Sequence, residues 1–290
     1  MNRKIIAQGG QAYTITLPIK WVREHGVDKL SEIDVIELEN SLVLRAPEVQ
    51  SSKSVTIALS QKPKRLHRLY ISCAYAAGYD EVIVDQKIDA KDLTQCLGFV
   101  IVRSNSQTVI KDISGVASQN IEEIFKQLFQ MIISHYKEAM RLLFVEKNYN
   151  SALLRERDIE INKFCWYLLR AVVKHKYTNS LESKLLFAYA YNLEQLSDEI
   201  VRMYAGARRE ACTKEVHTIV MRGEQVLEFA FNALHSKMSS ERVYTLRDTL
   251  RTKSYESITA KNAIVLMRFV KVIELATDLS QLTTIKHIER

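Results

Sequence analysis

A short acidic pattern occurs twice in this chain, eighty residues apart, in stretches with helical periodicity. The first copy, 193–198, reads LEQLSD, and the second, 273–278, reads IELATD. In each copy the Glu and the Asp are four residues apart, so both carboxylates lie on one face of a helix, where like charges repel by about 0.2–0.5 kcal/mol. Because this unfavourable pair is repeated, we expect a cation, Arg or Lys to offset it. We also predict that the C-terminal half of the chain is an internal duplication.

Residues 117–290 have a helical pattern almost throughout. Their length is enough for two halves of three helices each, separated by short polar breaks of the kind that antiparallel helices in a bundle require. Each half ends with the acidic pattern, and this arrangement resembles the fold of PhoU phosphate-uptake regulators. We predict helices at about 120–145, 150–174, 181–207, 212–237, 241–253 and 257–286.

The resemblance to PhoU proteins implies a metal-binding surface on the bundle. In that family each third helix carries Glu-x-x-x-Asp, usually with Arg-Ile-Gly between the acids, and an acidic motif on the preceding helix completes the surface. Here Gln195 and Leu275 replace the Arg, and Ser and Thr replace the Gly. Oxygen ligands of this type suit Mg²⁺, Mn²⁺ or iron. The implied ligands are Asp158, Asn162, Glu194 and Asp198 in the first half, and Glu274 and Asp278 in the second.

A different interpretation of the same acids is that they pair with neighbouring arginines and hold no metal. On the helix before the second copy, the only comparable acid is Asp248, so the second site is the less complete of the two. The arginines close enough in sequence to serve as partners are Arg155, Arg157, Arg202, Arg247 and Arg251.

The first 46 residues have the pattern of a β-hairpin, a short helix and a second β-hairpin. Gly9-Gly10 is a strong signal for a two-residue turn between β-prone runs. Pro18 suits the first turn of a helix, and Gly26 suits its end. A turn at Asn40-Ser41 then connects the second pair of strands. A unit with four short strands cannot bury enough apolar surface alone, so we expect two chains to combine here.

This N-terminal pattern resembles the AbrB/SpoVT swapped-hairpin DNA-binding domain. The likeness is carried by Gly10, the run TITLP at 14–18 and Lys20, although the usual x-Gly-Asp turn is replaced by SEID at 31–34. Members of that family interleave hairpins from two chains into one barrel and bind DNA through basic residues. The resemblance therefore implies a homodimer formed through residues 1–46 and contact with double-stranded DNA. The implied DNA-binding residues are Arg3, Lys4, Lys20 and Arg23 for phosphates, with Gln11 and Thr14 as neutral contacts.

Residues 50–115 have the element order β-α-β-α-β-β, which is typical of a small α+β layer. The strands are expected at 54–59, 81–84, 99–103 and 108–113, and the helices at 63–77 and 90–97. Lys62, Lys64, Arg65, His67 and Arg68 gather at the start of the first helix, as either an anion site or a solvated helix face. The whole chain is thus a multidomain α+β protein with segments 1–46, 50–115 and 117–290.

The chain lacks the sequence marks of several other protein classes. It has no apolar run of the eighteen residues that span a bilayer, and its N-terminus does not resemble a secretory signal. The four cysteines have no CxxC spacing, and we expect a cytoplasmic protein without disulfides. No Glu-x-x-His, His-Glu-x-x-His or nucleophile elbow is present, so we expect no enzymatic activity. The single histidines, His135, His175, His217 and His235, are expected to be exposed or hydrogen-bonded.

These observations lead to one functional hypothesis and one alternative. The net charge of +7 suits a polyanionic partner. The hypothesis is a DNA-binding regulator linked to phosphate uptake, with a dimeric head on DNA and a bundle that senses metal or a transporter partner. The alternative is an interaction protein whose head only dimerises and whose bundle docks on a phosphate-transporter ATPase or kinase.

Overall fold

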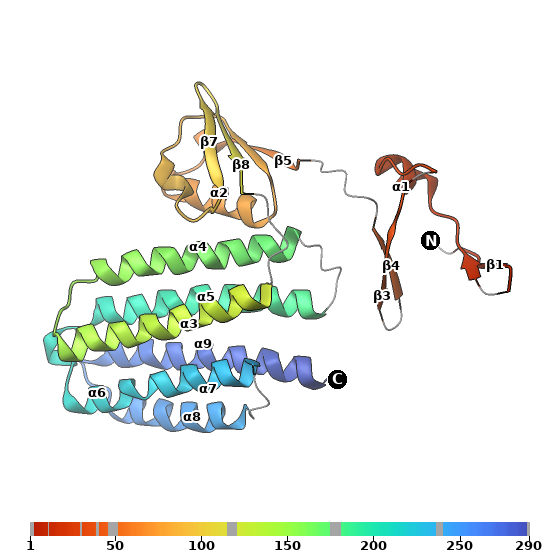
Figure 1. Cartoon of the computed structure of the whole chain (residues 1–290). Helices are drawn as coiled ribbons and strands as arrows, with labels where there is room; N and C mark the ends of the chain where they lie inside the picture. Colours follow the sequence, from red (N-terminus) through yellow and green to blue (C-terminus); the bar gives the residue numbers. More distant parts are fainter. Residues whose placement is uncertain are drawn as a thin grey trace. The chain divides into compact units, whose positions relative to one another are not determined.

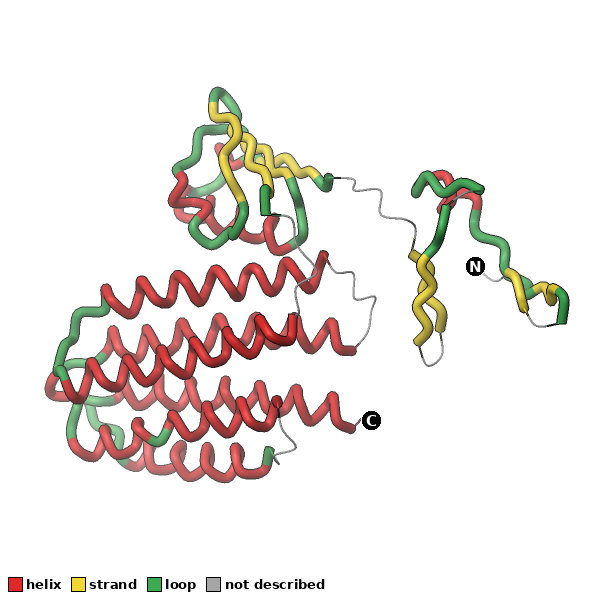
Figure 2. The backbone as a smooth tube through the Cα atoms, in the orientation of Figure 1, coloured by secondary structure: helices red, strands yellow, loops and turns green. Residues whose placement is uncertain are grey.

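The computed structural model describes residues 3–10, 12–29, 31–38, 41–45, 52–114, 121–174, 181–235 and 240–288. The chain divides into two compact units, Met1–Ser52 and Lys53–Arg290. It is an α+β protein with small sheets and a C-terminal helical bundle, as predicted (Figures 1 and 2). The second unit contains both the α/β layer expected at 50–115 and the bundle expected at 117–290.

The first unit begins with the predicted β-hairpin. Strand β1 (Ile6–Gln8) pairs antiparallel with β2 (Ala12–Thr14), and Gln8 lies opposite Ala12. This register leaves three residues, 9–11, in the connection, so the prediction of a two-residue turn was wrong by one residue. Gly9 and Gly10 have φ of 62° and 79°, a conformation that only glycine adopts at little cost.

A short helix and a second hairpin follow, also as predicted. Helix α1 (Ile19–Glu24) starts directly after Pro18, and Gly26 follows its end with φ of 61°. Strand β3 (Asp34–Leu38) pairs antiparallel with β4 (Ser41–Arg45). The turn was predicted at 40–41, but Ser41 is the first residue of β4 and lies opposite Leu38, and residue 40 lies outside the described residues. In the single chain the two hairpins are separate two-stranded sheets, and the barrel made by two chains stays a prediction.

The second unit starts with a four-stranded sheet. Its order is β5-β6-β8-β7, in which β5 (Ser54–Ile57) and β6 (Glu81–Val84) are parallel and the other pairs are antiparallel. Strands β7 (Phe99–Ser104) and β8 (Thr108–Asp112) form the expected hairpin. Helix α2 (His67–Ala76) connects the parallel strands and follows two 3₁₀ turns, η1 (Leu59–Gln61) and η2 (Lys64–Leu66). The second predicted helix is only a 3₁₀ turn, η3 (Ala90–Leu93).

The C-terminal helices form a bundle, and its division into two three-helix halves stays a prediction (Figure 1). In the first half, α3 (Ile121–Met140) continues into a π-helical turn (Arg141–Val145), followed by α4 (Ala152–Lys174) and α5 (Leu181–Gly206). The second half ends with α8 (Glu241–Glu256) and α9 (Ala263–Ile288). Helix α5 packs against both α4 and α9, so the two helices with the acidic pattern are neighbours in the bundle. The break predicted at 178–180 lies outside the described residues.

The helix predicted at 212–237 is divided into α6 (Lys214–Met221) and α7 (Gly223–His235), so that prediction was wrong. The cause is Tyr136 of α3, whose hydroxyl donates a hydrogen bond to the Val220 carbonyl at 2.5 Å. In a continuous helix that carbonyl would accept the amide of residue 224. A Cβ on Gly223 would clash with the same hydroxyl, so the break needs a residue without a side chain.

The sixth helix also starts later than predicted, at Ala263 in place of about 257. Asn262, which is buried, closes a turn before it. Its side-chain oxygen accepts from the Thr259 amide at 2.7 Å, and its side-chain nitrogen donates to the Ser257 carbonyl at 3.0 Å. Residues 257–262 therefore form a turn closed by the Asn262 side chain, in place of the first helical turn that the apolar pattern predicts.

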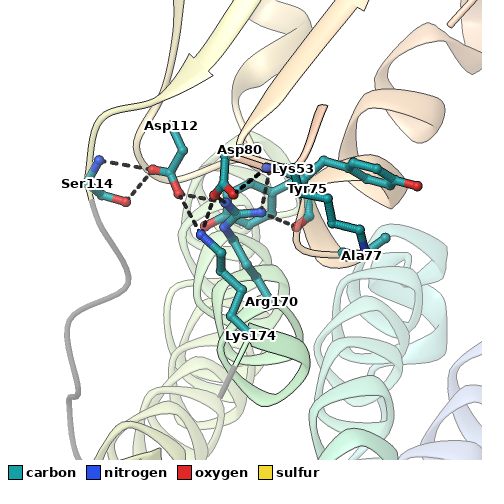
Figure 3. Close-up of polar contacts among 9 residues, drawn as sticks. Lys53, Tyr75, Ala77, Asp80, Asp112, Ser114, Arg170 and Lys174 are labelled. Atoms are coloured by element: carbon teal, nitrogen blue, oxygen red, sulfur yellow. Dashed lines mark hydrogen bonds and ion pairs between the residues drawn. The ribbon is translucent and has the colours of Figure 1, made fainter. Parts of the chain in front are cut away.

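The α/β layer is joined to the bundle through Arg170 of α4, whose side chain is fully buried (Figure 3). Its Nη1 donates to the carbonyls of Tyr75 and Tyr79 at 2.7 and 2.8 Å. Its Nη2 donates to the carboxylates of Asp80 and Asp112 at 3.0 and 2.6 Å. A buried guanidinium needs several acceptors, and those of Nη1 and Nη2 all come from the α/β layer, whereas Nε has no hydrogen-bond partner among the described residues. Lys174, one turn later on α4, also pairs with Asp80.

Candidate functional site

The cations predicted to contact DNA are all exposed on the first unit. Arg3 and Lys4 precede β1, and Lys20 and Arg23 lie on α1. Lys20 pairs with Glu24 at 3.7 Å, and an exposed i,i+4 pair of this kind contributes only about 0.3–0.5 kcal/mol. Ion pairs are recorded for none of the other three within the described part of the unit. These charges are therefore available to a polyanion.

The two predicted neutral contacts have different outcomes. Thr14, at the end of β2, is exposed, and its hydroxyl lies 3.5 Å from the Ile6 carbonyl across the hairpin. Gln11 lies outside the described residues.

The first unit leaves large apolar side chains in solvent. None of its described side chains is buried. Ile6 is 56% exposed, Tyr13 76%, Ile19 62% and Leu42 63%. A few scattered apolar residues are normal on a surface, but the described residues of this unit, none of which is buried, form no hydrophobic core.

In the bundle, the structure brings together the predicted acids of the first half. Asp158 of α4 faces Ser197 of α5, whose hydroxyl donates to Asp158 Oδ1 at 2.6 Å. The other carboxylate oxygen of Asp158 accepts from Asn162 Nδ2 at 3.2 Å. The Oδ1 atom of Asn162 is buried and has no hydrogen-bond partner among the described residues. The hydroxyl residue of the repeated pattern therefore links the two helices.

The remaining two acids of this cluster have partners on their own helix. Glu194 accepts from Gln195 Nε2 at 2.6 Å, and Asp198 pairs with Arg202 Nη2 at 2.5 Å. Arg202 also pairs with Glu199, which contacts Arg268 of α9 at 3.0 Å. The acid–arginine pairing that we considered from the sequence is thus present for Asp198.

The environment of the cluster makes its carboxylates harder to ionise. Burial raises the pKa of Asp158, and the nearby charge of Asp198 raises it further against the hydrogen bond from Ser197. Burial and Asp198 also raise the pKa of Glu194. Burial raises the pKa of Asp198 as well, although Arg202 opposes this shift. The three carboxylates therefore lie close together in a partly buried site, where their ionised forms are unfavourable, and a proton or a cation would stabilise them.

The donor set does not have the arrangement of a formed metal site. Across the described ranges, no three side chains of the His, Cys, Asp and Glu types are placed so that they could hold one ion. The carboxylates accept from Ser197, Asn162, Gln195 and Arg202 in this geometry. The predicted metal stays a prediction, and we derive no step that depends on it.

The second copy of the acidic pattern has different surroundings. Glu274 and Asp278 lie half-buried on α9, but Thr277 donates to the Ile273 carbonyl of its own helix at 2.7 Å. Asp248 of α8 pairs with Arg247 and Arg251 at 2.8 and 3.2 Å. Burial raises the pKa of Asp278, and Lys271 and Arg247 oppose this shift. No carboxylate from α8 is recorded beside this copy in the described residues, so only the first half has a cluster from two helices.

One buried histidine differs from the sequence prediction. His135 of α3 is fully buried, and neither ring nitrogen has a hydrogen-bond partner within the described ranges. The expectation that each single histidine is exposed or hydrogen-bonded was therefore wrong for His135. Burial, reinforced by the charge of Arg157, lowers its pKa to about 4. His175 lies outside the described residues.

Comparison with known proteins identifies no relative. No family model, curated protein or solved structure matches the chain. Within the described ranges, no helix combines the length and the apolar composition that crossing a bilayer needs.

Proposed function

We propose that this chain is a DNA-binding regulator linked to phosphate uptake, whose residues 1–46 from two chains form one head on duplex DNA. The main support is that the described residues of this unit bury no side chain while Ile6, Tyr13 and Leu42 stay more than half exposed. A second copy of the same unit can cover these side chains, since a symmetric dimer presents the same patch on both chains.

Dimerisation would also double the cationic surface. Arg3, Lys4, Lys20 and Arg23 are exposed in each chain, so two chains offer eight cations. Lys and Arg side chains that neutralise DNA phosphates release counterions, which makes the binding strongly salt-dependent. A two-fold head fits a two-fold-related DNA site, with phosphate contacts that position the protein.

In this proposal the bundle is the sensing part. In the described geometry Asp158, Glu194 and Asp198 do not surround one ion, but burial raises the pKa of all three, so a proton or a cation would stabilise the cluster. For occupancy of the bundle to alter DNA contact, the ligand and the DNA must bind two states of the molecule with different strength.

A second function is favoured by apolar side chains on the bundle surface. Phe187 and Tyr191 of α5 are 46% and 56% exposed, and Ile264 and Met267 of α9 are 59% and 60% exposed. Exposed apolar groups on neighbouring helices are suited to a protein partner. In this alternative the bundle docks on a phosphate-transporter ATPase or kinase, and the head only dimerises.

A fluorescence anisotropy titration of labelled duplex DNA at several salt concentrations separates the two functions. We expect Lys4→Ala/Lys20→Ala to weaken binding and to lower the salt slope by about 0.9 for each DNA phosphate that is no longer neutralised. The matched control, Lys184→Ala/Lys261→Ala, removes two exposed lysines from the bundle and should behave as the wild type. If the head variant keeps the wild-type affinity and slope, the DNA assignment is wrong.

A further inference from the structure

A second cationic surface lies at one end of the α/β layer. From residue 53 to residue 79 the chain has five Lys or Arg and no Asp or Glu. We define the α2 patch as the four of these that flank the start of helix α2, namely Lys62, Lys64, Arg65 and Arg68. All four are exposed.

Hydrogen bonds at the carboxyl ends of β5 and β6 order the backbone that carries the α2 patch. His67 Nε2 lies 3.1 Å from the Lys62 carbonyl, and His67 Nδ1 lies 3.1 Å from Gln86 Nε2. The Gln86 carbonyl accepts from the Thr108 hydroxyl at 2.8 Å. On the β5 side, the Ser60 amide donates to Asp85 at 3.0 Å. The turn that carries the cations is therefore ordered by buried or half-buried partners.

The charges of the α2 patch are not offset within the described part of the chain. No ion pair is recorded there for any of the four side chains, and Asp85, the nearest acid after β6, accepts from Ser60. Neither η2 nor α2 has a side-chain cap or an acidic residue in its first turn. Cations at a helix start oppose the helix dipole, whereas an anion there would be favourable. Both features favour an anionic partner.

The shape of the α2 patch indicates which anionic partner fits. A small anion is usually held in a concave pocket, but these cations stand on an exposed turn. Phosphates spaced along a duplex can be contacted by several exposed Lys and Arg side chains that lie close together in sequence. We propose that the α2 patch is a second contact surface for double-stranded DNA, outside the N-terminal head. This inference rests on the proposed function, because it assumes that the chain binds DNA.

The test uses the full chain and the same salt-series titration. The patch variant is Lys64→Gln/Arg65→Gln, extended to Lys62→Gln/Lys64→Gln/Arg65→Gln/Arg68→Gln. A matched control changes four exposed bundle residues to Gln: Arg155, Lys184, Arg209 and Lys261. We expect the salt slope to fall by about 0.9 for each phosphate released from its cation, twice as far in the four-residue variant as in the two-residue one. If the patch variants bind DNA as the control does, the inference is wrong.

Combining the patch and head variants separates this inference from the proposed function. If Lys4→Ala/Lys20→Ala weakens binding and the patch variants do not, the head assignment stands and the patch inference fails. If the patch variants weaken DNA binding and Lys4→Ala/Lys20→Ala does not, the patch inference is supported and the assignment of DNA binding to the head is wrong. Vesicles of phosphatidylcholine and phosphatidylserine test the other polyanionic surface. Vesicle binding that depends on the α2 patch, without any effect on DNA, would also overturn the inference.

Discussion

Arg170 of α4 and Asp112 of β8 form a buried ion pair across 58 residues of sequence, with 2.6 Å between Nη2 and Oδ2. The Arg170 side chain is fully buried, and that of Asp112 is 3% exposed. The same guanidinium lies over the Tyr75 ring, 4.8 Å from its centroid. This relationship ties the α/β layer to the bundle, and residues 53–290 form one compact unit.

We expect Arg170→Met to destabilise the second unit by about 3–5 kcal/mol, because it leaves the buried Asp112 carboxylate with Lys174, 3.9 Å away, as its remaining ion-pair partner among the described residues. Arg170→Met/Asp112→Asn should recover part of this loss, since the uncompensated charge is gone. Urea unfolding followed by circular dichroism measures both. The exposed Arg155→Met is the control and should change stability little. Equal stability of Arg170→Met and the wild type would contradict this expectation.

The same pair should make the protein sensitive to acid. Burial raises the pKa of Asp112, but hydrogen bonds from Ser114 and Arg170 outweigh this effect, and its pKa is lowered overall. A carboxylate with a lowered pKa contributes stability above its unfolded pKa of about 3.9 and loses it as the pH falls further. Unfolding of Asp112→Asn should therefore depend less on pH below about 4 than that of the wild type.

For the acidic cluster we expect Asp158→Asn to stabilise the protein at pH 7 by a few tenths of a kcal/mol, on the order of a like-charge pair. The new amide keeps the acceptor for Ser197, and Asn162 can turn so that its unpaired Oδ1 accepts from it. Since the pKa of Asp158 is raised, the ionised form is the unfavourable one in the folded state. The gain over wild type should thus be present at neutral pH and disappear below about pH 4.

Thermal melts of Asp158→Asn from pH 4 to pH 8 test this expectation, with Glu156→Gln, an exposed acid on the same helix, as the control. A loss of stability at pH 7 would mean that the carboxylates hold a cation. Elemental analysis of protein purified without chelator decides that case directly. If a metal is bound at the cluster, Asp198→Ala should lose it; a metal retained by that variant lies elsewhere.

His135 gives a third pH-dependent prediction. Its pKa is lowered to about 4 by burial first and by the charge of Arg157 second, while Glu138 opposes the shift. The folded state therefore excludes the charged form, and stability falls by up to about 1.4 kcal/mol per pH unit from about pH 6.5 to 4. His135→Phe keeps an aromatic ring and removes the titration. The difference in urea midpoint between the variant and the wild type should grow as the pH falls through this range, and a constant difference would contradict the assignment.

Much of the fold follows from local patterns in the sequence. Strand β6 matches its predicted range, and both N-terminal hairpins and α1 are present as predicted, although the connection in the first hairpin is one residue longer than predicted and Ser41 lies in β4. The elements that differ depend on distant residues. The division between α6 and α7 requires the Tyr136 hydroxyl, 84 residues before Val220, and no local pattern carries that information.

The candidate site divides in the same way. The partner of Asp198 lies four residues later on the same helix, so the spacing alone indicates that contact. The contact between Glu194 and Gln195 joins adjacent residues, which a helical spacing does not predict. The contact between Glu199 and Arg268 depends on the register at which α5 packs against α9, which the sequence does not indicate. The sequence offers only one indirect signal for Glu199, namely its place beside the acidic pattern. For His135, burial on the inner face of α3 overrides the usual preference of a single histidine for a partner or for solvent.

The central claim is that two chains combine through residues 1–46, and sedimentation velocity of the full chain at several concentrations tests it most directly. The account predicts a species of twice 33.4 kDa for the wild type. Ile15→Asp in the head should shift it to the mass of one chain, whereas Leu153→Asp, at an exposed apolar position on α4, should not. A wild-type chain that sediments as a monomer while residues 1–46 are folded would contradict the account. A dimer whose sedimentation is unchanged by Ile15→Asp would contradict it too.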